Sequence, residues 1–340
     1  MLKWDHITQK IETDKLGLIV ALVALVIIFS FFNSNYLSSA NLINILVAAS
    51  LPGLVAIGET YLIIAGLCDL STGSVAAFAS VLAAVLMQKG LSFFPMLLVV
   101  IGAGILVGYI NAWAVNKIKL ESFIATLATM SIFRGFAYII CDGKPVYIMD
   151  STFIDFGKER ILGLPIPVII LLLAFLLFGI ILAKTRFGRS VYVVGGSKNA
   201  ARLAGLDPER ITNVLFMLTG ALSALGGIIL GARMSSGQPA ASVGLEFDAI
   251  TAAVLGGTAF TGGVGTIFGT VLGVLILQGF NTGLIMLNVP VFWQFVARGM
   301  LLFIALAFDF LRKKNREKKL LEQSMALLEQ KEPPVKTTPA

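Results

Sequence analysis

The stretch RFGRSVYVVGGSKNAARLAGLDPER, Arg186–Arg210, is the only long polar interruption in the second half of an otherwise hydrophobic chain. Apolar segments lead up to it and away from it. Two consecutive glycines break the chain in its middle, and Ser197 follows where a helix N-cap would accept a backbone N–H bond. The spacing predicts a short helix over residues 198–204 that Gly205 ends.

A second helix is expected to start directly after the first, with Asp207 as its N-cap and Pro208 at its first position, where the missing N–H costs nothing. The predicted short helix presents small apolar side chains around one large one: Ala200, Ala201, Ala204 and Leu203. Such a surface suits docking into a groove of another protein. An ordinary cytoplasmic loop without a partner is the alternative interpretation.

The composition is that of a membrane protein that crosses the bilayer several times. Hydrophobic residues make up 57% of the chain, charged residues 13%, and the mean hydropathy is +0.91. Cys68 and Cys141 are far apart in sequence, so neither a metal site nor a disulfide framework is expected. The single histidine, His6, excludes catalytic or metal sites built on several histidines and disfavours an enzyme.

Ten apolar segments, several of about the length that crosses a hydrocarbon core, predict an all-α polytopic membrane protein with broken helices. The segments are residues 16–32, 42–66, 75–87, 93–115, 121–140, 164–183, 211–232, 247–260, 267–287 and 291–310. Residues 16–311 would form the transmembrane domain, and residues 184–210 its largest cytoplasmic loop.

Polar tails flank that domain. Residues 1–15 are expected to be a cytoplasmic tail, either a short interfacial helix or a plain tail. Residues 312–340 are a second cytoplasmic tail, in which RKKNREKK and LLEQSMALLEQ form a solvated helix and PPVKTTPA is disordered.

Lysine and arginine fix the orientation. With both termini in the cytoplasm, ten spans place 19 of the 26 basic residues on the cytoplasmic side and five in the opposite loops. The positive-inside rule therefore supports this topology. The net charge of +7 is mostly an orientation signal and does not indicate nucleic-acid binding.

The sequence LCDLSTGS, residues 67–74, interrupts the apolar pattern before the third segment. Asp69 cannot face lipid there, because an unsatisfied polar group in the bilayer costs several kcal/mol. It must line a cavity, cap a half-helix or lie at an interface.

The segments broken here and around Gly262 are faintly alike, as an internal repeat or a shared bias for small residues would make them. The mixed charge of loop 141–162 suits either a protein contact or solvent.

Three motifs resemble one family. The run VGGSKNAARLAGLDPERITNVLFMLTGALSALGGII is similar to the coupling segment of the membrane permease in ribose-type sugar ABC importers, where a short cytoplasmic helix sits in a cleft of the ATPase. LCDLSTGS resembles the family signature GG-I-D-L-S-x-G-S and departs from it at Leu67 and Cys68. SFIATLATMSIFRG is also similar, with Glu121 replacing a common proline. The resemblance runs from about Asn41 to Asp309.

The resemblance implies a permease subunit in the bacterial inner membrane that imports a monosaccharide such as ribose. Its partners would be an ABC ATPase, an extracytoplasmic substrate-binding protein and a second or homologous permease. GGTAFTGGVGT lacks the Lys-Ser/Thr of a phosphate loop, so ATP would be bound by the separate ATPase, with no cofactor or metal here.

Two groups of residues carry these expectations. ATPase coupling is assigned to Ser197, Lys198, Asn199, Ala200, Ala201, Arg202, Leu203, Ala204 and Gly205. The translocation pathway is assigned to Asp69, Ser71, Ser74, Phe123, Thr126 and Arg134, which would line or brace the cavity.

Other functions stay open. A permease of the same family could move nucleosides, an autoinducer furanose or branched-chain amino acids. An ion-coupled secondary transporter would also use broken helices and an intramembrane acid, but it would work without an ATPase. A membrane enzyme is disfavoured because clustered catalytic side chains are missing from the sequence pattern.

Overall fold

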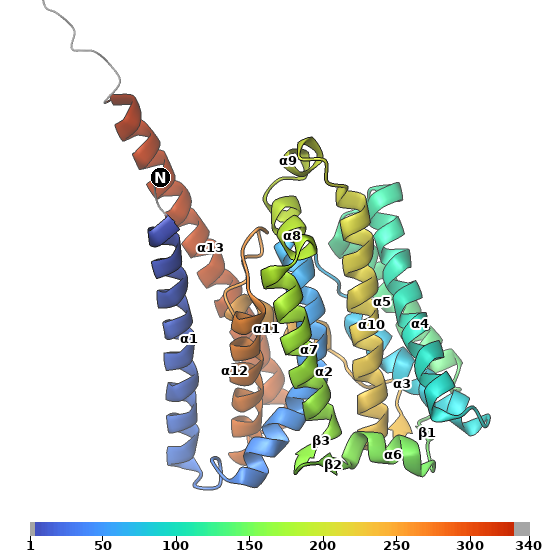
Figure 1. The fold of residues 1–340 in the computed structure, drawn as a ribbon. Helices are drawn as coiled ribbons and strands as arrows, with labels where there is room; N and C mark the ends of the chain where they lie inside the picture. The colour runs from blue at the N-terminus through green and yellow to red at the C-terminus, as the bar shows by residue number, and fades with distance from the viewer. Residues whose placement is uncertain (1–3, 330–340) are drawn as a thin grey trace, which may run out of the picture.

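The computed structural model describes residues 4–329, which are almost entirely helical. Figure 1 shows the helices as a bundle of long, roughly parallel rods. The helices are α1 (Trp4–Phe32), α2 (Ser39–Ile64), α3 (Thr72–Gln88), α4 (Phe93–Trp113) with a π-helical turn (Ala114–Ile118), α5 (Ser122–Ile139), α6 (Ser151–Lys158), α7 (Ile166–Lys184), α8 (Arg186–Gly196), α9 (Lys198–Leu203), α10 (Pro208–Met234), α11 (Leu245–Leu255), α12 (Ile267–Met286) and α13 (Val291–Glu329).

Each predicted apolar segment coincides with one helix, so the all-α polytopic fold is confirmed. The number ten is not. Among the described residues, seven helices are long and apolar enough to cross a membrane: α2, α4 with its π-turn, α5, α7, α10, α12 and the first part of α13. The apolar part of α1 and the whole of α3 are shorter, and α11 is shorter still.

The structure extends both outer helices beyond the predicted spans. α1 is continuous from Trp4, so residues 4–15 prolong the first apolar helix and form neither a separate interfacial helix nor a plain tail. α13 runs unbroken to Glu329, and the predicted cytoplasmic tail helix is its continuation. The end PPVKTTPA, residues 333–340, lies outside the described residues.

The core is built around α2 and α10, each of which packs against several other helices. α10 packs against α4 and α3, and α2 packs in the same way against α12 and α11. Likewise, α3 contacts α5 as α11 contacts α13. This pattern relates α2–α5 to α10–α13 in order. It pairs the start of α3 with the start of α11, so the internal repeat is not the expected pairing of the Asp69 and Gly262 breaks.

Glycines allow the closest of these helix contacts. A Cβ on Gly104 or Gly108 of α4 would overlap the backbone of α10 at Gly220 or Phe216. A Cβ on Gly227 of α10 would overlap the backbone of α3. In lipid, where no hydrophobic force drives helices together, such small residues let backbones touch and maximise van der Waals packing.

The region predicted as a polar loop, residues 141–162, is folded. β1 (Val146–Tyr147) pairs with β4 (Ser236–Gly237), α6 follows, and β2 (Arg160–Ile161) pairs with β3 (Leu164–Pro165). Asp150 caps α6 by accepting a bond from the Phe153 N–H, and the Phe153 ring is buried. These elements lie at the opposite end of the bundle from α8 and α9 (Figure 1).

Candidate functional site

A turn, residues 65–71, joins α2 to α3 inside the bundle and is buried except at Gly66; we call it the buried turn. Asp69 in this turn is 1% exposed. Its Oδ1 accepts hydrogen bonds from the Ser71 N–H at 2.8 Å and the Ser71 hydroxyl at 2.6 Å. Its own N–H donates to Glu59 Oε2 at 3.3 Å. The turn therefore organises its backbone with its own side chains, as short polar residues do next to a helix start.

α4 and α5 hold the buried turn from the side. Asn111 Nδ2 donates to Asp69 Oδ2 at 3.3 Å and to Ser71 Oγ at 3.0 Å, and Thr129 donates to Asn111 Oδ1 at 2.7 Å. Thr126 Oγ1 accepts a bond from the Leu70 N–H at 3.0 Å. Three helices and the turn thus form one polar network that provides acceptors for the N–H groups of residues 68–71.

The structure brings together four of the six predicted pathway residues. Asp69, Ser71, Ser74 and Thr126 are buried in or beside the turn, and the Ser74 hydroxyl donates to the Ser71 carbonyl at 2.7 Å. Phe123, at 53% exposure, lies on the outer side of α5. The hydrogen bonds of the buried four run within the turn and to α4 and α5, and the lining and bracing roles both stay predictions.

Arg134, the sixth, lies apart from the turn and holds a second one. Its Nη1 donates to the carbonyls of Pro239 and Ala241, at 2.8 Å and 2.7 Å. These belong to the segment between α10 and α11, in which Ser235 and Ser242 take left-handed backbone conformations. Arg134 thereby fixes the chain directly before the start of α11.

Sequence reasoning missed Asn111 and Thr129 as parts of the network. Asn111 was detectable, because it is a lone amide inside the apolar segment 93–115, and such a group needs a partner in lipid. Nothing in the sequence spacing indicated that its partner would be Asp69, which lies in the turn between α2 and α3.

The network borders polar atoms that lack partners. Among the described residues, Glu59 Oε1, Thr72 Oγ1 and Glu246 Oε2 are buried and make no hydrogen bond. Glu246, at the start of α11, sits directly on Gly73, where a Cβ would overlap its carboxylate. The starts of α3 and α11 therefore meet at a polar interior with unused hydrogen-bonding capacity.

At the end of the bundle opposite α6, α9 has the predicted caps (Figure 1). The Ser197 hydroxyl accepts a bond from the Ala200 N–H at 3.2 Å, and Gly205 takes φ +77° after the helix. Asp207 caps α10 by accepting bonds from the N–H groups of Glu209 and Arg210, and Pro208 is the first helical residue.

The face of α9 differs from the prediction in one residue. Leu203 is 92% exposed, and Ala200 and Ala204 are exposed beside it. Ala201 is fully buried and belongs to the main hydrophobic core, so it anchors α9 to the bundle and is not available to a partner. The remaining coupling residues are exposed: Ser197, Lys198, Asn199, Arg202 and Gly205.

α8 was not predicted as a helix. It is amphipathic, with Val191 and Val194 buried, and the Tyr192 hydroxyl donates to the Gly265 carbonyl at 2.7 Å. Burial raises the pKa of Tyr192, so this phenol stays a protonated donor. Gly263 N–H donates to the Ile64 carbonyl at 2.7 Å. α8 and the loop before α12 thus meet the end of α2 directly under α9.

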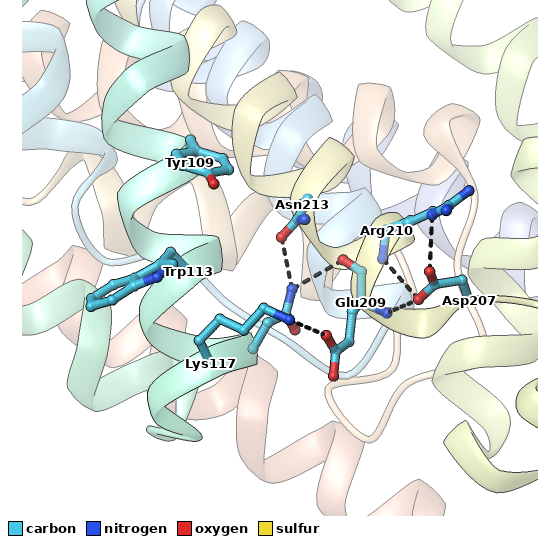
Figure 2. A pocket seen from close by; sticks show the side chains of 8 residues that line it. Tyr109, Trp113, Lys117, Asp207, Glu209, Arg210 and Asn213 are labelled. Atoms are coloured by element: carbon cyan, nitrogen blue, oxygen red, sulfur yellow. Dashed lines mark hydrogen bonds and ion pairs between the residues drawn. The ribbon is translucent and has the colours of Figure 1, made fainter.

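A pocket opens next to α9, between α4 with its π-turn and the start of α10 (Figure 2). Its cavity volume is about 240 Å³. Its lining residues are Tyr109, Trp113, Asn116, Lys117, Asp207, Glu209, Arg210 and Asn213. Lys117 and Lys119 both bind Glu209, at 3.2 Å and 3.1 Å, which ties the α4–α5 connection to α10.

The sequence of this chain is similar to a known family and to several known proteins. Residues 41–306 match the family described as the branched-chain amino acid transport system permease component. The ribose import permease of Bacillus subtilis is 41% identical over 306 residues, covering 89% of this chain and 94% of that protein.

The L-arabinose transport permease of Escherichia coli is 40% identical, over 89% of this chain and 92% of its own length. The D-allose transport permease of the same organism is 37% identical, over 88% and 93%. No solved structure matches the chain.

Proposed function

Because the chain belongs to this family of transport permeases, we propose that it is the membrane permease subunit of an ATP-binding-cassette importer for a monosaccharide. The relatives named for ribose, arabinose and allose favour a sugar over the branched-chain amino acids of the family description. The protein would work in the bacterial cytoplasmic membrane.

The observation that carries the proposal is the exposed leucine of α9. Leu203 is 92% exposed on a capped helix that lies outside the candidate spans. Ala201 anchors the opposite side of the same helix in the core. A large apolar side chain held out on a fixed helix is typical of an anchor that fills a partner's groove. We infer that the groove belongs to the ATPase subunit.

The solute would cross where the starts of α3 and α11 meet. Both helices begin inside the bundle, and the unpartnered atoms of Glu59, Thr72 and Glu246 lie around their starts. When the two helices separate, these groups would gain the hydroxyl partners that they lack in the closed interior. A polyhydroxylated solute provides such partners. A second permease copy and an extracytoplasmic binding protein would complete the importer.

Reconstitution tests the function. The permease, its cognate ATPase and binding protein in proteoliposomes should accumulate labelled ribose, arabinose or allose only when ATP is supplied, and excess leucine should not compete. Sugar uptake driven by a sodium or proton gradient without ATP would contradict the proposal and favour a secondary transporter. Competition by leucine would indicate a branched-chain amino acid permease.

A further inference from the structure

The residues that line the pocket between α4 and α10 have no role in the sugar transport proposed above. Figure 2 shows Tyr109, Trp113 and Lys117 along one side, on α4 and its π-turn, and Asp207, Glu209, Arg210 and Asn213 on the other. The two sides are joined by Lys117–Glu209 and by Asn116, whose Nδ2 donates to the Glu209 carbonyl at 3.0 Å and Asn213 Oδ1 at 2.7 Å.

All carboxylate oxygens in the pocket are already occupied. Glu209 Oε1 binds Lys119 and Oε2 binds Lys117. Asp207 Oδ1 accepts the two N–H groups that it caps, and Oδ2 binds Arg210 Nε at 3.0 Å. The pocket therefore has little acceptor capacity left for a ligand that donates hydrogen bonds.

Its donors are in excess. Lys117 uses one of three N–H groups on Glu209, and Arg210 uses one of five on Asp207. In the part of the chain that the structure describes, neither the Trp113 indole N–H nor the Tyr109 hydroxyl makes a hydrogen bond. With Lys119, three basic side chains face two acidic ones, so the cluster keeps a net positive charge. The lining is suited to an anion with several oxygen atoms.

The pocket lies at the membrane boundary. Tyr109 and Trp113 are 47% and 48% exposed and continue the exposed apolar side of α4, to which Leu98 and Leu106 belong. Tyrosine and tryptophan prefer the level of the lipid headgroups, and the charge asymmetry places this end of α4 on the cytoplasmic side. The aromatic side of the pocket thus faces lipid, while Lys117 and Arg210 reach the aqueous surface.

We propose that this pocket binds the phosphate group of an anionic phospholipid from the cytoplasmic leaflet. The Lys117 ammonium binds the phosphate oxygens, and Arg210, whose guanidinium lies beside Asp207 (Figure 2), adds positive charge at the rim of the pocket. Trp113 and Tyr109 flank the glycerol region, and the acyl chains lie along the apolar side of α4. Because Glu209 also holds the start of α10 directly after α9, the lipid sits beside the element that we assign to ATPase coupling. The binding itself does not depend on the transported solute.

Short-chain lipids added to the purified full-length protein test the site. With Trp4→Phe and Trp293→Phe, Trp113 is the only tryptophan, and its fluorescence reports occupancy. Dioctanoyl-phosphatidylglycerol should change the emission saturably, and dioctanoyl-phosphatidylcholine should bind much more weakly. Lys117→Gln and Arg210→Gln should each weaken binding about fivefold, the value of one basic residue near an anionic surface.

Two variants separate the pocket from general electrostatics and from loss of fold. Glu209→Gln should tighten phosphatidylglycerol binding, because it releases two lysines and removes a negative charge. Lys184→Gln removes an exposed lysine at the cytoplasmic end of α7, outside the pocket, and should leave binding unchanged. Melting temperatures of all variants, read in the same samples, should stay close to that of the parent.

Several outcomes would overturn the proposal. Equal binding of both lipids, or equal loss in Lys117→Gln and Lys184→Gln, would mean that the pocket does not recognise the phosphate. Saturation by inorganic phosphate with the same affinity would identify a soluble ligand in place of a lipid. If phosphatidylglycerol does not bind but Lys117→Gln loses the ATPase in phosphatidylcholine nanodiscs, the pocket is a protein contact.

Discussion

The chain contains two polar breaks that obey opposite rules. The buried turn at residues 65–71 puts a carboxylate, Asp69, where it is 1% exposed, and satisfies both of its oxygens from the protein. The segment around α9 puts a leucine, Leu203, where it is 92% exposed, and leaves it uncovered. A charged residue is therefore buried at the first place, and an apolar residue is exposed at the second.

The two places differ in whether this chain provides the contacts that the unusual residue needs. Around Asp69 the hydrogen-bonding groups come from the same chain, from the turn itself and from α4 and α5, so the turn is a complete structural unit. Around Leu203 no side chain of the described residues covers the surface, and we propose that the ATPase subunit covers it. Changes at the first site should therefore affect folding, and changes at the second should affect assembly only.

The largest effect is expected for Asp69→Ala. It leaves the Ser71 N–H, the Ser71 hydroxyl and the Asn111 amide without their acceptor in the interior, at a cost of about 3–5 kcal/mol. The yield of monodisperse protein in detergent and its melting temperature should fall sharply. Asp69→Asn keeps one carbonyl oxygen for Ser71 and should fold better, while transport by it is impaired. A wild-type melting curve for Asp69→Ala would show that the turn is not the unit we describe.

Leu203→Asp should come next, and its effect should be confined to assembly. A carboxylate desolvated in the partner's groove lowers affinity by about a hundredfold, so ATPase recovery on co-purification should be lost at unchanged membrane levels and melting temperature. Ala204→Glu should act alike, and exposed Arg202→Ala should do less. Ala201→Glu should instead destabilise the permease, because Ala201 is buried. Unchanged ATPase recovery and sugar uptake with Leu203→Asp would remove α9 from the coupling interface.

Thr126→Val sharpens the comparison within the buried turn. Valine matches the shape of threonine but cannot accept the Leu70 N–H, so stability should fall by about 1–3 kcal/mol. Thr126→Ser keeps the hydroxyl and serves as the control. Melting curves of the two variants in the same detergent measure the difference, and equal curves would mean that the Leu70 bond contributes nothing.

The smallest effect is expected for Ser197→Ala, which removes the N-cap of α9 at a cost of about 1 kcal/mol. The helix should fray locally, so amide hydrogen exchange should quicken over residues 198–203 while the melting temperature stays the same. A global loss of stability would show that α9 contributes to the core more than its one buried alanine suggests.

The sequence predicted what depends on neighbouring residues. Capping by Ser197 and Asp207 follows from side chains two or three positions from their partners, and the apolar segments follow from length and hydropathy. α8 escaped prediction because Arg186 and Arg189 make its segment look like a polar loop, although its buried face is apolar.

What the sequence could not predict depends on distant partners. Asn111 lies on α4 and Asp69 in the turn between α2 and α3, and only the packing of α4 beside α3 brings them together. The burial of Ala201 also depends on distant residues: α9 carries two neighbouring alanines, Ala200 and Ala201, and the position of the bundle decides which of them is buried. The turn between α10 and α11 depends on Arg134, which is about a hundred positions away.

The glycine contacts between α4 and α10 have a mechanical consequence. Where the backbones of Gly104 and Gly220 touch, neither helix can slide along the other without prising the pair apart, so the two behave as one lever. One arm of that lever begins at Pro208, four residues after Ala204 of the α9 segment, and the other carries Asn111 to the carboxylate of Asp69. A displacement of α10 would therefore carry α4 and Asn111 with it as far as the carboxylate of Asp69, and only the short connection around Gly205 separates α9 from that lever.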